Sequence, residues 1–165
     1  QLSDFAVSKS QRRVLKKNKD LRVENRPIKI TEESENLFHR HKQRFDHAVP
    51  DSIYNFLSHQ PATVPCEARE LAVYLDEKLI ASTYYDIGKN SISAIYSIFD
   101  PRHQNRSLGI FLLLNGINYA IESRKEFLYH GYCYDRSSFY DYKKRFIGTE
   151  DFDWKSSWIS IDRNF

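Results

Sequence analysis

Cysteine, glycine and methionine are scarce in this chain, whose 165 residues include two cysteines, five glycines and no methionine. Cys66 and Cys133 are too few for a disulfide framework and too isolated for a cysteine-type zinc site. No apolar run approaches the roughly 20 residues that a membrane-spanning helix needs, and the first residues do not resemble a signal peptide. We therefore expect a soluble, cytoplasmic protein. Because the sequence starts at Gln1 and not at methionine, we also expect that it was processed or trimmed, or belongs to something longer.

Apolar and aromatic residues are abundant enough for a folded core. Hydrophobic residues make up 41% of the chain and aromatic residues 15%, which excludes a disordered or fibrous protein. A chain of this length is by default one domain, with a core that needs no disulfides. We therefore expect a single domain over residues 1–165.

The positive charge is concentrated near the N-terminus. The formal net charge is +3, but residues 1–30 alone carry +6 and the remainder carries −3. Ser8 or Ser10 can cap a helix that runs to about Asn18, which makes residues 1–20 a basic N-terminal helical segment. Val14 and Leu15 are expected to dock inward. Five basic residues of this helix share one face at spacings of three and four: Lys9, Arg12, Arg13, Lys16 and Lys17. Such a face suits an RNA backbone, although a charge run is more often a solvated surface.

The remaining pattern predicts a mixed α/β (α+β) fold with a mainly antiparallel sheet. Strands are expected over 21–30, with Pro27 at an edge or a strand end, and over 69–76, 78–86 and 91–99, joined by tight turns into a meander. Helices are expected over 31–46, 51–58, 106–123 and 136–146, and further strands over 127–133 and 154–161.

The expected helix over 106–123 is apolar nearly all round and therefore buried. It follows a strand and a polar loop, an arrangement that fits the acetyltransferase-like fold. In that fold a helix N-terminus after the central strand binds a phosphate-bearing acyl donor. Free backbone N–H groups and the positive end of the helix dipole would meet an anion there.

Three blocks of sequence resemble one family. They are SKSQRRVLKKNKDL (8–21), SISAIYSIFDPRHQNRSLGIFLLLNGI (91–117) and FLYHGYCYDRSSFYDYKKRF (127–146). The ordered motifs SQRRVLK, YxxFDP, RSLG and GYxxxxSxxxxYKxxF are similar to those of the C-terminal, acetyltransferase-like domain of aminoacyl-tRNA–protein transferases. This family comprises the arginyltransferases and the bacterial leucyltransferases that act on N-terminal Asp and Glu.

The resemblance implies an enzyme that passes an amino acid from aminoacyl-tRNA to the N-terminal amine of a protein, which marks that protein for degradation through an N-degron. It implies tRNA and an acceptor protein as partners, with no DNA or membrane partner, and no cofactor in this chain beyond aminoacyl-tRNA as co-substrate. The sequence departs from the family in two respects. Nothing here matches the family's cysteine-rich N-terminal domain, and Phe139-Tyr140 replaces the usual Lys-Met.

The resemblance also implies roles for particular residues. Asp86 and Asp100 are candidates for holding or deprotonating the acceptor amine, although Asp100 can equally cap the following turn and Asp86 can be a strand-end turn residue. The donor and tRNA side would be formed by the basic face of the N-terminal helix together with Arg106, Ser107, Leu108, Gly109, Tyr132, Tyr142 and Lys143. Tyr142 and Lys143 would meet the terminal adenosine by stacking and charge, or belong to the edge of the core.

The histidines do not suggest a metal site. His39 and His41 are two residues apart and point to different faces of a helix, His130 in a strand is interpreted as structural, and His103 lies alone in the polar loop. We expect no bound metal.

Two other functions stay open. The chain could be an N-acyltransferase of the same superfamily that uses acyl-CoA, although Gly109 is the only glycine of its phosphate loop. It could also be a non-catalytic module that binds RNA or protein.

Overall fold

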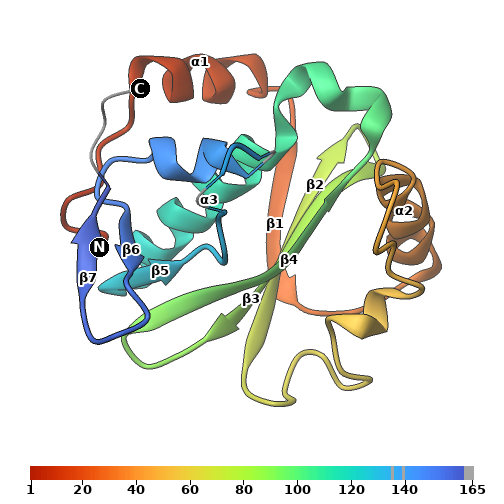
Figure 1. Ribbon diagram of the computed structural model, residues 1–165. Helices are drawn as coiled ribbons and strands as arrows, with labels where there is room; N and C mark the ends of the chain where they lie inside the picture. Colours follow the sequence, from red (N-terminus) through yellow and green to blue (C-terminus); the bar gives the residue numbers. More distant parts are fainter. Residues whose placement is uncertain (135, 139, 162–165) are drawn as a thin grey trace.

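A computed structural model describes residues 1–134, 136–138 and 140–161. Its centre is a twisted sheet with the strand order β1-β2-β3-β4-β5 (Figure 1). These strands are β1 (Arg22–Pro27), β2 (Ala68–Leu75), β3 (Lys78–Ile87), β4 (Ser91–Phe99) and β5 (Phe127–Tyr129). The first four are antiparallel neighbours, and β5 pairs parallel with β4. The expected meander and the edge position of Pro27 are thereby confirmed.

Helices cover both faces of this sheet. They are α1 (Lys9–Lys17), α2 (Glu32–Lys42) and α3 (Leu108–Glu122). Side chains alternate between faces along β2: Ala72 and Tyr74 join the core beneath α2, whereas Leu71 and Val73 join the cores on the α3 side. In Figure 1 α2 accordingly lies to one side of the sheet and α3 to the other.

The expected burial of α3 is confirmed, because eight of its fifteen residues are buried. The helix approaches β3 closely. A Cβ at Gly116 would collide with the hydroxyl of Tyr85, which is itself 1% exposed. Glycine therefore allows α3 to pack directly on the central strand.

Several expected elements are shorter than predicted or of another type. In place of the helices expected over 51–58 and 136–146, the described residues of these ranges form short 3-10 helices at Ile53–Asn55 and Asp141–Arg145. The helix over 31–46 ends at Lys42 and the strand over 127–133 at Tyr129. The single strand over 154–161 is instead a two-stranded hairpin of β6 (Glu150–Phe152) and β7 (Trp158–Ser160), which turns at residues that were predicted to be extended.

The beginning of the chain lies against its final quarter. The N-terminal amine donates to the carbonyl of Gly148 at 3.0 Å, and the N–H of Leu2 donates to the carbonyl of Glu126 at 2.9 Å. The N-terminus accordingly appears beside β6 and β7 in Figure 1. Residues 1–8 therefore link the start of α1 to the region of β5 and the hairpin.

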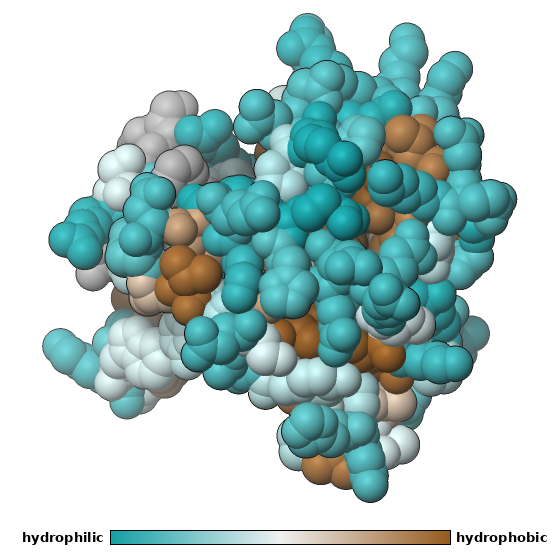
Figure 2. Space-filling view, turned by 90° about the vertical axis from the view of Figure 1, so that its right-hand side faces the viewer, coloured by the Kyte–Doolittle hydropathy of each residue, from teal (hydrophilic) through white to brown (hydrophobic). Residues whose placement is uncertain are grey.

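The surface on the α2 side is mostly hydrophilic and carries several separate hydrophobic areas (Figure 2). Val49, Phe56 and Val64, in the segment between α2 and β2, are each more than a third exposed. Among the described residues, no helix has the length and apolar character needed to cross a membrane.

Candidate functional site

The basic face predicted for the N-terminal helix is present on α1. Ser8 caps the helix by accepting from the N–H of Gln11, whose side chain in turn accepts from the N–H of Ser8, so the helix start is fixed by a reciprocal pair of hydrogen bonds. All five basic side chains of this face are exposed. We call them the α1 basic face.

The inward side of α1 differs from the sequence prediction. Val14 packs against the core as expected, but Leu15 is 36% exposed. The buried polar residues Gln11 and Asn18 lie at the spacing of Val14 and complete the docking side. The expectation for Leu15 was wrong because hydrogen bonding at the ends of this short helix, and not apolar character alone, fixes which side faces the protein.

The end of α1 is joined to the residues that precede α3. The side-chain amide of Asn18 donates to the carbonyls of Arg106 at 2.9 Å and Val14 at 3.0 Å, and the ammonium of Lys17 donates to the carbonyl of Asn105. A shallow hollow of about 350 Å³ lies at this junction. Its lining residues are Lys16, Lys17, Lys19, Asp20, Asn105 and Arg106. The fold thus brings Arg106 next to the α1 basic face.

Arg106 is already paired in this arrangement. Its two terminal nitrogens donate to both carboxylate oxygens of Asp20 at 3.0 and 2.9 Å. The guanidinium hydrogen-bonds hold the pKa of Asp20 below its usual value. An anion at this hollow would therefore share Arg106 with Asp20 and meet the neighbouring lysines more freely.

α3 begins at a residue with unusual backbone geometry. Ser107 has φ 56° and ψ 45°, in the left-handed region, and its side chain caps no N–H group. The carbonyl of Ser107 accepts from Ile110 and Phe111, so the N–H groups of Leu108 and Gly109 lie ahead of the first hydrogen bonds within the helix. Leu108 itself is 1% exposed and anchors the turn in the core.

Tyr142 is brought from the end of the chain to this helix start. A Cβ at Gly109 would lie 3.6 Å from the Tyr142 hydroxyl and 3.8 Å from the ring of Phe99. Lys143 points elsewhere, and its ammonium donates to the carbonyl of Tyr132 at 3.3 Å. Tyr132 is 79% exposed and stacks on Trp154. The last motif is therefore divided between the start of α3 and an outer aromatic surface, and its Phe139 lies outside the described residues.

Asp100 is fully buried between two arginines. Its carboxylate accepts from Arg40 at 2.9 Å and from Arg102 at 2.9 and 2.6 Å. It also caps the 3-10 helix Pro101–Arg106 by accepting from the N–H of Arg102. The hydrogen bonds and charge of Arg102, assisted by Arg40, hold the pKa of Asp100 far below its usual range. This geometry favours the capping role over that of a proton-accepting base, and it involves two arginines that sequence reasoning did not identify.

Asp86 lies at the other end of the sheet. It pairs with Ser93 across the strands, near the beginning of β4, whereas Asp100 follows the end of β4. At about 3.3 Å per residue the two positions are roughly 20 Å apart. One oxygen of Asp86 is buried and has no hydrogen-bond partner among the residues that the structure describes. The two carboxylates predicted to act on one amine therefore do not form a single site.

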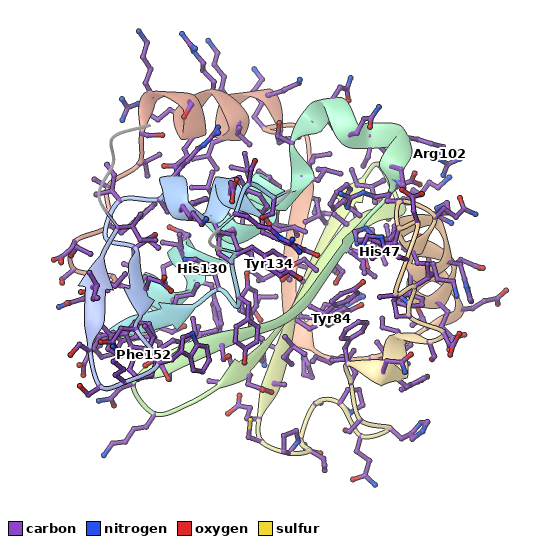
Figure 3. All side chains as sticks on the ribbon, viewed as in Figure 1. His47, Tyr84, Arg102, His130, Tyr134 and Phe152 are labelled. Atoms are coloured by element: carbon purple, nitrogen blue, oxygen red, sulfur yellow. The ribbon has the colours of Figure 1, made fainter. Side chains whose placement is uncertain are left out.

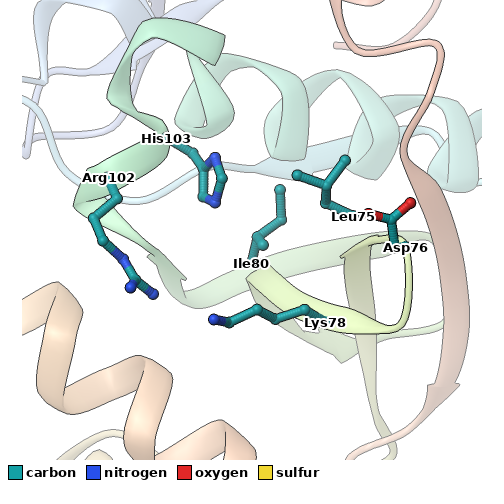
Figure 4. A pocket seen from close by; sticks show the side chains of 6 residues that line it. All are labelled: Leu75, Asp76, Lys78, Ile80, Arg102 and His103. Atoms are coloured by element: carbon teal, nitrogen blue, oxygen red, sulfur yellow. The ribbon is translucent and has the colours of Figure 1, made fainter.

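A second hollow, of about 400 Å³, lies on the other side of the 3-10 helix Pro101–Arg106 (Figure 4). In Figure 4 Arg102 and His103 line one side of it and Lys78 the other, with the apolar side chain of Ile80 between them and Leu75 and Asp76 at one end. Arg102 is 61% exposed although it contacts Asp100. This hollow therefore also carries basic side chains, from Lys78 and Arg102.

β4 and β5 separate after a short contact. Only Ser91–Ser93 of β4 pair with Phe127–Tyr129, and β4 has an irregularity opposite Tyr84 and Tyr85 before it continues to Phe99. His130 follows β5 at this separation. Burial, followed by the charge of Lys143, lowers the pKa of His130 to about 4, and its Nδ1 has no partner among the described residues. In the view of Figure 3, Tyr134 and His47 lie on opposite sides of β4.

His41 is a buried part of the end of β4. Its Nδ1 accepts from the N–H of Phe99 at 3.1 Å, and its ring packs edge-on against Phe99 and Tyr96. Burial lowers the pKa of His41 to about 4, so the ring is neutral at pH 7. Among the described residues, no three His, Cys, Asp or Glu side chains are grouped as they would be around a metal ion.

Comparisons with known proteins point to one family. A family model described as "Arginine-tRNA-protein transferase, C terminus" matches residues 33–153. The chain is similar to proteins named aspartate/glutamate leucyltransferase from three bacteria. Identity is 28% for Leptospira interrogans, over 98% of this chain and 66% of the relative. Identity is 31% for Nitrobacter winogradskyi, over 96% of this chain and 66% of the relative. It is 37% for Shewanella putrefaciens, over 86% of this chain and 60% of the relative. The chain therefore spans about two thirds or less of these relatives.

Solved structures are similar to this chain at low sequence identity. L-PGS from Bacillus licheniformis is 12% identical, with a TM-score of 0.50 over 74% of this chain and 41% of that protein. The PaiA N-acetyltransferase from Thermoplasma acidophilum, in complex with coenzyme A, is 16% identical, with a TM-score of 0.44 over 62% and 74%. The mixed α+β fold expected from the sequence, a mainly antiparallel sheet with flanking helices, is confirmed.

Proposed function

Because the chain belongs to the family of arginine-tRNA-protein transferase C-terminal domains, we propose that it passes an amino acid from aminoacyl-tRNA to the N-terminal amine of an acceptor protein. The relatives named aspartate/glutamate leucyltransferase suggest leucyl-tRNA as donor and N-terminal aspartate or glutamate as acceptor. The tRNA and the acceptor would be the two partners of this domain.

One structural observation supports the RNA part of the proposal most strongly. The α1 basic face is exposed, and α1 is joined to the start of α3 through Lys17 and Asn18. A phosphate backbone that lay along α1 would lead toward the N–H groups of Leu108 and Gly109. The second hollow would extend this path to Lys78 and Arg102. Lysine and arginine side chains release counterions when they neutralise phosphates, which favours such binding.

The start of α3 suits the donor end of the reaction. The acceptor amine attacks the ester carbon that joins the amino acid to ribose, negative charge develops on the carbonyl oxygen, and the 3′ oxygen leaves with a proton. Backbone N–H groups at Leu108 and Gly109 would oppose negative charge there. The Tyr142 hydroxyl lies over the same turn and would contact the terminal nucleotide.

Asp100 has a positioning part in this proposal. By holding Arg40, Arg102 and the 3-10 helix Pro101–Arg106 together, it sets the segment that leads into α3. Asp86 stays a candidate for binding an ammonium group, but at a position roughly 20 Å away along β4.

The proposal is tested with labelled aminoacyl-tRNA and the complete native protein. We expect label from leucyl-tRNA to appear on peptides that begin with Asp or Glu and not on peptides that begin with Ala. A triple variant, Lys9→Glu, Arg13→Glu and Lys16→Glu, should lower transfer at least about tenfold by removing phosphate contacts. The matched control reverses three exposed lysines elsewhere, Lys29, Lys89 and Lys155, and should transfer at close to the parent rate.

Two results would contradict the proposal. One is the absence of transfer from leucyl-tRNA and arginyl-tRNA alike to every peptide. The other is transfer of label from acetyl-CoA in their place, which would establish the acyl-CoA reaction.

A further inference from the structure

Arg44 is an exposed arginine that follows α2 and extends over the end of β4. Its guanidinium carbon lies 4.3 Å from the centre of the Phe99 ring and 5.9 Å from that of Phe45. Among the residues that the structure describes, no carboxylate lies within 4.0 Å of it. Arg40, one helical turn earlier, is instead paired with Asp100. Stacking engages the face of a guanidinium and leaves its edge, with the N–H donors, available for a second partner.

The described side chains that interact with Arg44 are aromatic: Phe45, Phe99, Tyr96 and Tyr142. Burial raises the pKa of Tyr96 to about 12, and the positive charge of Arg44 acts on it in the opposite direction. Tyr142 is affected in the same two ways. The Phe99 ring lies against the Arg44 guanidinium and also packs on the ring of His41, which is neutral. An arginine that has no carboxylate partner among the described residues, and that lies beside phenol hydroxyls and aromatic rings, is suited to one planar carboxylate on a short apolar stem.

This position is adjacent to the start of α3. The Phe99 ring that supports Arg44 is also in contact range of Gly109, as is the Tyr142 hydroxyl. An amine that attacked an ester held at Gly109 would therefore bring its own side chain close to Phe99 and Arg44. Phosphates of an RNA backbone fit this position less well, because the groups beside Arg44 are aromatic. They are better suited to α1 and its hollow, where several basic residues lie next to one another.

We propose that Arg44 selects the acidic side chain of the acceptor's first residue by forming a bidentate ion pair with its carboxylate across the Phe99 ring. This inference rests on the proposed function, because it concerns the acceptor of that reaction. It assigns Arg44 a part in specificity and none in making or breaking bonds.

The expected effect is a change in discrimination between acceptors. A site that pairs a carboxylate rejects an amide of the same shape, since the amide has no charge and only one acceptor oxygen. Peptides that begin with Asp should be preferred over peptides that begin with Asn by about ten- to hundredfold in kcat/KM. Arg44→Gln should reduce this preference to below about threefold, chiefly by raising KM for the Asp peptide, while the KM for aminoacyl-tRNA stays the same.

The experiment compares four proteins on this pair of peptides: the parent chain, Arg44→Gln, Arg44→Lys and the control Lys29→Gln. Arg44→Lys retains the charge without the bidentate geometry and should be intermediate, whereas Lys29→Gln should equal the parent. Direct binding of each fluorescently labelled peptide to the four proteins, without tRNA, provides a readout that needs no catalysis.

The outcomes separate this inference from the proposed function. Unchanged discrimination in Arg44→Gln would overturn the inference while transfer itself continued. An equal loss for both peptides with a raised KM for aminoacyl-tRNA would show that Arg44 binds RNA instead, which also overturns it. If no protein transferred label, the proposed function would fail, and preferential binding of the Asp peptide that depends on Arg44 would still support the inference. Equal binding of the two peptides would overturn it.

Discussion

At the end of β4, the buried carboxylate of Asp100 has three partners: the guanidinium groups of Arg40 and Arg102 and the N–H of Arg102. A buried charge with this many hydrogen bonds stabilises the native state only while all its partners remain. The residue therefore matters to the segment before α3 whether or not it meets the substrate.

Asp100→Asn should be destabilising. We expect a loss of about 3 kcal/mol in the free energy of unfolding, because two arginines lose their common anion. Urea denaturation at pH 7 measures this change in the free energy of unfolding. Asp46→Asn, at an exposed position, is the control and should change stability by less than about 0.5 kcal/mol.

The same substitution has a pH signature. The folded protein holds the pKa of Asp100 below its unfolded value of about 4, so its contribution is fully present above that value and is lost as the pH falls below it. The difference in stability between parent and variant should therefore shrink below about pH 4. A difference that stayed constant down to pH 2 would contradict this account.

Sequence reasoning identified Asp100 but not its partners. The Asp-Pro pair predicts a capped turn from local chemistry alone, and the structure has that turn. Arg40 and Arg44 reach the end of β4 only because α2 packs on the sheet. Local sequence patterns do not predict such a contact. Glu70 is buried and pairs with Arg26 on the neighbouring strand. Its burial likewise cannot be predicted without knowing how the strands are arranged in the sheet.

At the scale of elements, the attachment of α1 to the start of α3 is the contact on which the proposed RNA path depends. Asn18 provides it through the carbonyls of Val14 and Arg106 and is 1% exposed. The helix is short and gains little stability from its own hydrogen bonds. Its orientation therefore depends on this end and on the Ser8 cap.

Asn18→Ala should loosen α1 without unfolding the sheet. We expect faster hydrogen exchange at the amides of residues 12–18 and about a tenfold loss in tRNA affinity, because the α1 basic face is no longer held beside Arg106. Exchange measured by mass spectrometry, together with filter binding, tests both effects. The exposed Gln104→Ala on the same side should leave both unchanged. Normal exchange with normal affinity in Asn18→Ala would show that other contacts hold the helix.

Elements set by nearby residues were predicted well, and those that depend on distant contacts were not. Tight turns at Asp76-Glu77 and Gly88-Lys89-Asn90 define the β2–β3–β4 meander, so its limits agree closely with the structure. The 136–146 region was expected to be helical. Its described residues, 136–138 and 140–146, include a 3-10 helix at Asp141–Arg145, where Tyr142 packs over Gly109 and side chains such as Lys144 bond to the backbone.

For the molecule as a whole, the distribution of charge is more informative than its total. The net charge of +3 is small for an RNA-binding protein, yet basic side chains gather on the α1 basic face and in each of the two hollows beside the 3-10 helix Pro101–Arg106. The sequence does not reveal that α1 lies beside the 3-10 helix Pro101–Arg106, and the closeness of these basic groups is evident only from the fold.

Binding of tRNA should therefore depend steeply on salt. If the α1 basic face makes five phosphate contacts, affinity should fall about 500-fold between about 50 and 200 mM monovalent salt. Filter binding over this range measures the slope. The triple reversal of Lys9, Arg13 and Lys16 should reduce the slope by about three, whereas the triple reversal of Lys29, Lys89 and Lys155 should not. A slope near zero for the parent chain would exclude binding through phosphates.

The outer edge of β1 has a consequence for how the molecule behaves at high concentration. Edge strands expose unpaired N–H and C=O groups that can recruit another sheet and begin aggregation. Along β1, Pro27 removes one donor, and Arg22, Glu24 and Arg26 place alternating charges beside the remainder. A second strand that approached would have to accommodate the proline ring and bring these charges out of water. The edge of the central sheet formed by β1 is therefore built to resist self-association.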